Sequence, residues 1–248
     1  MTNMKPLEGE YTLESHLLRI QNLGYTLVFD ALPPDLVSRL VDKMDKLMPT
    51  HGISPGSQTP ECTTRDINRL YELDPLFEDL MDYPTVFPIV EAAMEGDITL
   101  FGSAIADLMP PGSATRSTPW HRDGRDGPYF RFTYFLTDLT EDGGPTAVLP
   151  GTHRAESGPP DWFRTPDRIP KEIPGMVKVV VPAGTCMIND TNIWHTSTPN
   201  FSENPRKLIW TVFKTADQAL PSEDLRNSQW FVDRQTDPLR RKLCGTDV

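Results

Sequence analysis

Cysteine is scarce in this chain of 248 residues, which contains only Cys62, Cys186 and Cys244. They are far apart and form no CxxC pair, so the sequence offers neither a disulfide framework nor a cysteine-based zinc site. Long apolar runs are missing as well, since none approaches the roughly 20 residues that a membrane-spanning helix needs. The opening residues, MTNMKP, lack the basic and apolar segments of a signal peptide. These absences predict a soluble, cytoplasmic protein without a membrane partner.

Positive charge is also in short supply. Lys and Arg total 24 against 35 Asp and Glu, which leaves a formal net charge of −11. Because an acidic surface repels phosphate backbones, we expect no nucleic-acid partner. The 11 Phe and 5 Trp residues argue against a disordered chain. A chain of this length can bury a sizeable core without help from disulfides or metals.

Proline, in contrast, is abundant. It occupies 25 of the 248 positions, about twice the typical share of ~5%. Proline is excluded from helix interiors and central strands, so the chain should contain many loops between short elements. This composition disfavours both a helical bundle and a Rossmann-like parallel sheet.

The first hundred residues are predicted to be partly helical. Apolar side chains recur at helical spacing in four segments, and a short apolar strand separates the first two segments. The second helix is expected to begin at Pro33-Pro34-Asp35 and to end at Pro49. The other helices are expected at 12–22, 74–81 and 85–94, and the strand at 25–29.

From residue 98 onward, short β-like runs alternate with turns rich in proline and glycine. No helix-length segments separate them, which argues against parallel β-α-β winding and favours a double-sheet barrel or jelly roll. We predict a mainly β fold with flanking helices, as a single domain over 1–248. It would comprise a helical N-terminal part (about 1–95), a jelly-roll core (about 96–216) and a C-terminal extension with one helix (217–248). The strands are expected at 98–106, 130–136, 147–149, 177–181, 185–188, 194–198 and 208–213.

Three side chains could form a metal site. His121 and Asp123 are two positions apart, so on an extended strand both would point to the same face. His195 lies much later, on another predicted strand. Two histidines and one carboxylate form the ligand set of non-haem Fe(II) oxygenases, whereas a structural zinc site would use four ligands, usually richer in cysteine. The alternative without a metal is that the His-x-Asp spacing occurs by chance and that the histidines are packed, hydrogen-bonded strand residues.

Arg206 and Ser197 indicate which kind of small molecule would bind beside such a metal. Ser197 shares a strand face with His195, and Arg206 begins the next apolar strand. A guanidinium and a hydroxyl beside a metal form a fork for a carboxylate. A dicarboxylic 2-oxo acid could therefore chelate the metal at one end and meet Arg206 at the other. Taken alone, an arginine is more commonly part of a surface ion pair.

Four segments occur in an order that is typical of one enzyme family. Residues 24–32 (GYTLVFDAL) would be an opening strand, and 120–123 (WHRD) a metal motif. Residues 144–154 (GPTAVLPGTHR) would be a glycine-rich stretch, and 194–200 (WHTSTPN), followed by Arg206, a distal histidine and an anion-binding arginine. Together they resemble the phytanoyl-CoA dioxygenase family of Fe(II)- and 2-oxoglutarate-dependent oxygenases. The resemblance covers most of the chain.

This resemblance implies a double-stranded β-helix, the cupin-like jelly roll, with helices packed outside. It also implies two groups of site residues: the iron ligands His121, Asp123 and His195, and the 2-oxoglutarate ligands Arg206, Ser197 and Thr146. The implied reaction uses O2 to oxidise a small organic molecule, by hydroxylation, desaturation or a related C–H oxidation, with release of succinate and CO2. We expect that molecule to be a metabolite in a biosynthetic pathway.

Two other classes of protein remain open. A cupin-like metalloenzyme that does not use 2-oxoglutarate would share the histidines without needing Arg206 or Ser197. A non-catalytic small-molecule-binding jelly roll would keep only the fold, although an intact metal triad beside an arginine argues against it. The sequence carries no signal for an oligomeric state.

A CoA thioester is not expected as the substrate, because its phosphate charges need several basic side chains at the pocket mouth. At most two of the four arginines near the metal motif could converge on one phosphate group. Arg131, in particular, should face away from Phe130 and Phe132, which are candidates for the pocket wall. The four are Arg116, Arg122, Arg125 and Arg131. The proline-rich segment 155–175 is long enough to act as a lid.

Overall fold

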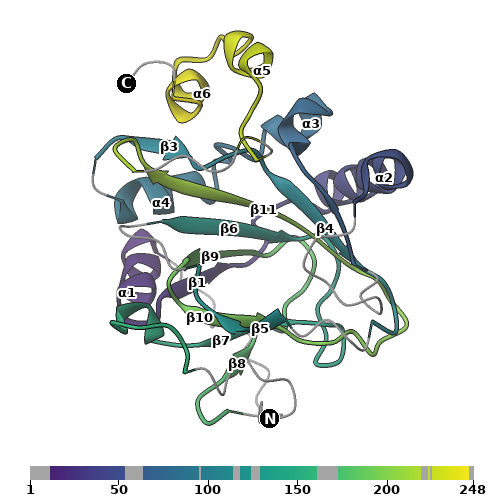
Figure 1. The fold of residues 1–248 in the computed structure, drawn as a ribbon, viewed down its shortest axis with the longest axis vertical. Helices are drawn as coiled ribbons and strands as arrows, with labels where there is room; N and C mark the ends of the chain where they lie inside the picture. The colour runs from purple at the N-terminus through teal and green to yellow at the C-terminus, as the bar shows by residue number, and fades with distance from the viewer. Residues whose placement is uncertain are drawn as a thin grey trace.

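The computed structural model describes residues 12–53, 64–94, 96–113, 118–123, 129–160, 173–218, 223 and 225–245. Short helices flank a β core (Figure 1). The four helices predicted in the first hundred residues are confirmed, and the tail forms two helices in place of the single one expected. The α-helices are α1 (Leu13–Leu23), α2 (Pro34–His51), α3 (Pro75–Glu78), α4 (Phe87–Ala93), α5 (Gln229–Asp233) and α6 (Pro238–Leu243).

The predicted end of α2 at Pro49 is wrong. The helix continues to His51, with Pro49 inside its last turn. Proline there removes a single backbone donor, and the helix still closes because Gly52 N–H donates to Met48 O at 2.9 Å. Of the predicted apolar stripe of α2, Leu40 and Met44 are buried, whereas Leu36 and Leu47 are half-buried and Val37 and Met48 take the buried positions beside them.

The strands in the described residues form two antiparallel sheets. One has seven strands in the order β1-β9-β6-β11-β4-β2, with β3 beside β11, and the other has four in the order β5-β10-β7-β8. The strands are β1 (Tyr25–Val28), β2 (Arg65–Ile67), β3 (Ile98–Leu100), β4 (Ile105–Met109), β5 (Thr118–His121), β6 (Phe130–Phe135), β7 (Thr146–Leu149), β8 (Val177–Lys178), β9 (Cys186–Asp190), β10 (Trp194–Ser197) and β11 (Arg206–Thr215).

The run 98–106 is two strands and not one. Between β3 and β4, Ser103 N–H leaves the ladder and donates to Leu225 O at 2.8 Å, so this stretch pairs with the C-terminal segment. Short β2, absent from the sequence prediction, pairs with β4, and β1 pairs with β9. Strands from the first hundred residues thus complete the edges of the seven-stranded sheet.

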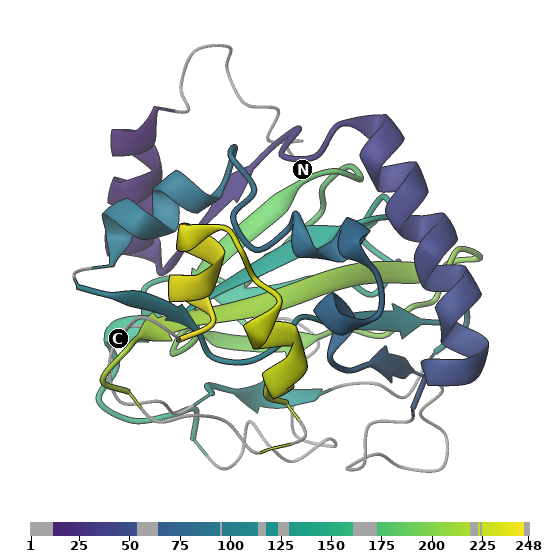
Figure 2. The same cartoon turned by 90° about the horizontal axis from the view of Figure 1, so that it is seen from above.

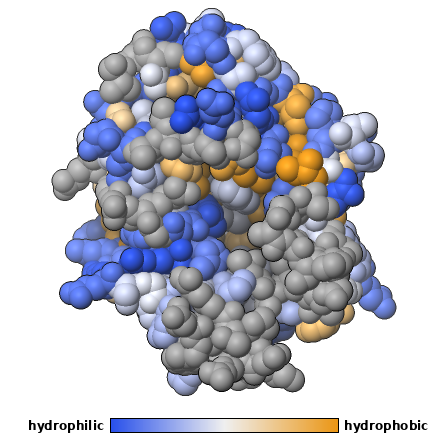
Figure 3. All heavy atoms as spheres, in the orientation of Figure 1, coloured by the Kyte–Doolittle hydropathy of each residue, from blue (hydrophilic) through white to orange (hydrophobic). Residues whose placement is uncertain are grey.

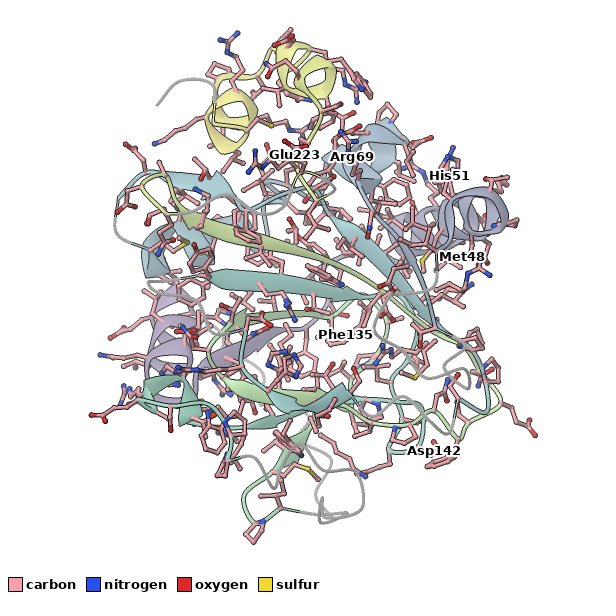
Figure 4. The ribbon with its side chains drawn as sticks, viewed as in Figure 1. Met48, His51, Arg69, Phe135, Asp142 and Glu223 are labelled. Carbon is pink, nitrogen blue, oxygen red and sulfur yellow. The ribbon has the colours of Figure 1, made fainter. Side chains whose placement is uncertain are left out.

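The seven-stranded sheet has two different faces, which β6 illustrates. Phe130, Phe132 and Tyr134 belong to the main apolar core, together with residues of the helices. The alternate residues point toward the four-stranded sheet: Arg131 lines a cavity, and Phe135 lies in a smaller cluster between the sheets (Figure 4). Figure 2 shows the helices lying across the outer face of the seven-stranded sheet. The inner face is therefore the one available for a site.

The C-terminal helices are attached to the region around α3 by ion pairs. Arg240 Nη2 lies 2.9 Å from Asp82 Oδ1 and 3.1 Å from Asp79 Oδ1. Arg234 forms an ion pair with Glu78. Helices α5 and α6 of the extension therefore belong to the helical layer, on the opposite side of the large sheet from the cavity.

No helix of the described ranges has the length and apolar character needed to cross a membrane. In the view of Figure 3, apolar side chains reach the surface in small groups among hydrophilic ones. The largest exposed fractions among the big apolar side chains belong to Phe201 and Trp230. These two residues lie in different parts of the chain, in a loop before β11 and in α5.

Candidate active site

Two neighbouring strands bring the candidate metal ligands together. His121 ends β5 and lies directly opposite His195 of β10, with 4.2 Å between the ring centroids. Asp123 follows just beyond the end of β5, where its backbone N–H donates to Thr191 O at 3.1 Å. One ligand atom from each of the three side chains lies within 4.8 Å of the others. The spacing argument for His121 and Asp123 therefore leads to the predicted cluster, although Asp123 lies outside the strand itself.

Hydrogen bonds orient both imidazoles. His121 Nδ1 donates to Pro119 O at 2.8 Å, and His195 Nδ1 donates to Ile193 O at 2.9 Å. A carbonyl oxygen only accepts, so each Nδ1 carries a proton, and the neutral form of each ring has its lone pair on Nε2. His195 Nε2 is buried and has no hydrogen-bond partner among the described residues. Such an oriented Nε2 is what a metal-binding histidine presents, and the residues present therefore fit a cation.

Burial keeps His195 neutral. The loss of solvent lowers its pKa to about 4, and repulsion by His121 and Arg131 acts in the same direction, while Asp123 opposes it. A neutral imidazole is the form that coordinates a metal.

Arg131 holds the carboxylate of Asp123 through the oxygen on the side away from His121. Asp123 Oδ1 lies 3.8 Å from His121 Nε2, and Asp123 Oδ2 accepts a hydrogen bond from Arg131 Nη2 at 2.7 Å. Arg131 comes from β6, in the other sheet. The metal-binding cluster is thus connected to both sheets.

A cavity of about 210 Å³ lies between the sheets beside this cluster. It contains all the other predicted site residues: Arg206 at the start of β11, Ser197 at the end of β10 and Thr146 at the start of β7. Thr146 and Ser197 are cross-strand neighbours. The described lining residues are Asp107, His121, Arg131, Thr133, Thr146, Val148, Met187, Asn189, His195, Thr196, Ser197, Arg206, Leu208 and Trp210.

Arg206 lies in a buried network at the far end of the cavity. Its Nη1 donates to Gly144 O, and its Nη2 donates to Asp107 Oδ1, both at 2.8 Å. Its Nε is buried without a hydrogen-bond partner in the described chain. Gly144 adopts φ 74, and an added Cβ would lie 2.8 Å from Met109 Sδ, so glycine is required at this point of the network. The surface ion pair considered for Arg206 is excluded, because the residue is only 3% exposed.

Asp107 and Trp210 of the cavity were not singled out from the sequence, and Arg131 was considered only as one of the arginines near the metal motif, on the face opposite to Phe130 and Phe132. Asp107 and Arg131 are charged residues inside apolar strands, and that contrast is a usable signal, because a buried charge needs a partner. Trp210 is the aromatic residue of the cavity wall. The expectation that Phe130 and Phe132 form this wall is wrong, because both face the helical layer.

The remaining predicted features lie partly outside the described residues. Arg116, Arg125 and the middle of the proposed lid segment, residues 161–172, lie outside them. Arg122 donates to the carbonyls of Ala155 and Glu156 at 3.2 and 3.4 Å, so it is held against the first part of the 155–175 segment.

Solved structures show the same fold. The epimerase SnoN from nogalamycin biosynthesis, a non-haem α-ketoglutarate-dependent enzyme, superposes with a TM-score of 0.71 at 20% identity, over 92% of this chain and 90% of SnoN. HygX from Streptomyces hygroscopicus, solved with nickel, 2-oxoglutarate and hygromycin B, superposes with a TM-score of 0.68 at 16% identity, over 85% of this chain and 93% of HygX. The predicted jelly-roll core is confirmed.

Sequence comparisons point to one family. "Dioxygenase af480" from Aspergillus fumigatus is 25% identical over 162 residues, which cover 61% of this chain and 48% of that protein, so the match spans about half of this relative. The family model described as phytanoyl-CoA dioxygenase (PhyH) matches residues 20–208 of this chain. The predicted enzyme class, an Fe(II)- and 2-oxoglutarate-dependent dioxygenase, agrees with this match and with the relatives named here. The chain therefore belongs to the phytanoyl-CoA dioxygenase family.

Proposed function

We propose that this protein uses Fe(II), 2-oxoglutarate and O2 to oxidise a small organic molecule, with release of succinate and CO2. The observation that carries the proposal is the pair of oriented histidines beside Asp123, the buried His195 and the half-buried His121, at the wall of a cavity that also contains Arg206. The reaction would be a hydroxylation, a desaturation or a related C–H oxidation. In this role the bound metal and cosubstrate supply the activation of O2, and the protein supplies binding, orientation and exclusion of water.

His121, Asp123 and His195 are the proposed iron ligands. The backbone carbonyls of Pro119 and Ile193 hold the two imidazoles in the coordinating tautomer. Three protein ligands leave positions open on an octahedral metal, which a chelating 2-oxo acid and O2 require.

Arg206, Ser197 and Thr146 are the proposed ligands of the cosubstrate. They line the same cavity as the histidines, and Arg206 lies with its Nε unpaired. The two hydroxyl residues face each other across β10 and β7. The far carboxylate of 2-oxoglutarate would bind at this end of the cavity, and its 2-oxo acid end would face the histidines.

The formal charges of the site support joint binding of the two groups. Arg131 and Arg206 balance Asp107 and Asp123, and His195 is neutral. A divalent cation and a dianionic 2-oxo acid together leave this balance unchanged, whereas either alone would leave net charge in a largely buried site. We therefore expect the metal and 2-oxoglutarate to strengthen each other's binding.

A small metabolite of a biosynthetic pathway is the proposed substrate class. A second structure of SnoN contains Fe3+, α-ketoglutarate and nogalamycin RO, and the HygX structure contains hygromycin B. The cavity of about 210 Å³ is smaller than the ~300–1,000 Å³ typical of sites for drug-sized ligands, so it would hold the cosubstrate and the reacting end of the substrate.

A free acid, alcohol or amine fits this chain better than a CoA thioester. Of the arginines near the metal motif, Arg122 is bound to backbone carbonyls and Arg131 to Asp123. Neither is placed to receive a phosphate at the cavity mouth. We expect millimolar CoA or a generic acyl-CoA to leave 2-oxoglutarate turnover unchanged at low salt. Strong inhibition, or succinate release that depends on an acyl-CoA, would contradict this part of the proposal.

Anaerobic titration tests the central proposal. Fe(II) and 2-oxoglutarate added together should produce a visible metal-to-ligand charge-transfer band, and neither should produce it alone. Binding of Fe(II) without any band would favour a cupin-like metalloenzyme that does not use 2-oxoglutarate. Absence of metal binding would favour a non-catalytic binding protein.

A further inference from the structure

Among the described residues that line the cavity, Arg131 is a cation to which the proposed function assigns no ligand. It lies on β6, between β9 and β11, with Asn189 and Val212 as its cross-strand neighbours. Hydrogen-bonded ladders on both sides therefore fix its backbone. Its side chain points into the cavity and is 20% exposed.

Two contacts fix the guanidinium. Nη2 donates to Asp123 Oδ2 at 2.7 Å, and Cζ lies 4.8 Å from the ring centroid of Trp210 on β11. Nε is buried and has no hydrogen-bond partner among the described residues. Stacking on an indole and an ion pair with a carboxylate together restrict a long side chain to one arrangement.

A cation at this place is unfavourable for metal affinity taken by itself. A guanidinium one carboxylate away from a divalent ion repels that ion and draws negative charge from the shared ligand. Holding the carboxylate in place is the compensating effect that the geometry offers. Asp123 Oδ2 is occupied by Arg131, whereas Oδ1 lies 3.8 Å from His121 Nε2, on the side of the imidazoles.

We propose that Arg131 is a positioning residue that makes Asp123 a one-oxygen ligand. By engaging Oδ2, it presents Oδ1 alone to the metal and prevents the carboxylate from turning to bind through both oxygens. A second carboxylate oxygen would take a coordination position that the 2-oxo acid or O2 needs. This inference rests on the proposed function. It adds that binding of 2-oxoglutarate requires Arg131 as well as the proposed ligand residues.

The inference predicts that metal binding and cosubstrate binding respond differently to loss of Arg131. In Arg131→Met, which keeps an unbranched chain against Trp210, the Arg131 contact that holds Oδ2 of Asp123 is removed. Ni(II) affinity, measured by calorimetry, should be retained or become tighter. The affinity of the Ni(II)-loaded protein for 2-oxoglutarate should fall by at least ~10-fold, equivalent to ~1.4 kcal/mol, because the second oxygen of Asp123 would compete with the 2-oxo acid for a coordination position. The Fe(II)–2-oxoglutarate band should weaken in parallel, and Arg131→Lys should recover part of it.

Arg234 provides a matched control. It also forms an ion pair with a carboxylate, Glu78, and stacks over an indole, with Cζ 5.1 Å from the ring centroid of Trp230. It lies in the helical layer, away from the cavity. Arg234→Met should leave both affinities at the wild-type level, so any effect of Arg131→Met on 2-oxoglutarate is not a general effect of losing such a pair.

The outcomes separate this inference from the proposed function. If the wild-type Ni(II) protein does not bind 2-oxoglutarate, the proposed function fails, whatever Arg131 does. If the wild type binds it and Arg131→Met binds it equally well, only the role of Arg131 is overturned. A parallel loss of Ni(II) and 2-oxoglutarate affinity would also overturn it, since that is the mark of a merely structural residue. Should Arg131→Met fail to fold, as thermal unfolding would reveal, Arg131→Gln, which is too short to repeat the contact, is judged by the same criteria.

Discussion

The seven-stranded and the four-stranded sheet face each other across the cavity but are packed very differently. The larger sheet carries the main apolar core on its outer face, where Phe132 and Phe213 pack with ring centroids 4.7 Å apart beneath the helices. On the smaller sheet, Trp120 and Ala147 are the described buried apolar residues of the outer cluster, and their neighbours are only partly buried. Most of the stabilising burial therefore belongs to one sheet.

The two sheets also contribute different chemistry to the site. The smaller sheet and its β5 extension provide His121, Asp123 and His195. The larger sheet provides the arginines, Arg131 and Arg206. The well-packed larger sheet holds the arginines in place, while the proposed metal ligands lie on the smaller sheet and are connected to the larger one through Arg131.

The largest expected effect on activity comes from a substitution on the smaller sheet. His195→Ala should reduce turnover to background and abolish Fe(II) binding, because it removes one of three ligands without disturbing the main core. Metal content and succinate release are the measurements. His51→Ala is the control, since His51 lies exposed at the end of α2, far from the cavity (Figure 4), and should behave as wild type. Wild-type metal affinity in His195→Ala would remove His195 from the site.

A pair of aromatic truncations tests the difference in packing directly. Phe132→Ala should lower the free energy of unfolding by about 3–5 kcal/mol, because it opens a cavity in the main core. Trp120→Ala removes a larger side chain but should cost less, because its partly buried neighbours can close over the gap or admit water. Urea unfolding of both variants measures the two costs. A greater loss for Trp120→Ala would mean that the smaller sheet is packed as firmly as the larger one.

Arg206→Ala should affect the cosubstrate more than the metal. A charge-assisted contact to a carboxylate is worth roughly 1.5–3 kcal/mol, so the 2-oxoglutarate KM should rise at least about tenfold. Arg206→Lys should recover only part of this. The Ala variant also leaves Asp107 buried without its arginine partner, so Arg206→Ala combined with Asp107→Asn separates the two effects. The double variant should regain stability but keep the raised KM, and an unchanged KM in either variant would refute the carboxylate role.

The smallest expected effect lies at the edge of the larger sheet. His16 on α1 is hydrogen-bonded to Thr26 on β1 at 2.8 Å, and burial, with a smaller contribution from Arg19, lowers its pKa. The unfolded chain therefore takes up this proton at a higher pH than the folded one, so the free energy of unfolding should fall as pH drops below the ordinary histidine pKa of ~6.5. His16→Gln should show less of this loss. Urea unfolding at about pH 7.5 and about pH 5.5 provides the measurement, and equal losses in both proteins would contradict the assignment.

Much of the fold could be predicted because the relevant signals are local. The helical spacing of Leu36, Leu40 and Met44, and the short apolar runs between proline and glycine turns, depend only on neighbouring residues. The predictions that were wrong concern residues whose contacts come from distant parts of the chain. Ser103 leaves its strand to bind Leu225, and Phe132 faces a helical layer that the strand pattern alone could not place.

The sequence by itself determined which chemical groups are present and how close neighbours along the chain are spaced. His121 and Asp123 were recognisable because a two-residue spacing is preserved in an extended segment, and the further motifs pointed to His195 and Arg206 by their order. Only the tertiary structure decided that Arg131 holds Asp123 and that Asp107 holds Arg206. These contacts depend on how two sheets are stacked and on the register of strands far apart in the chain, and such relations arise from packing of the whole domain.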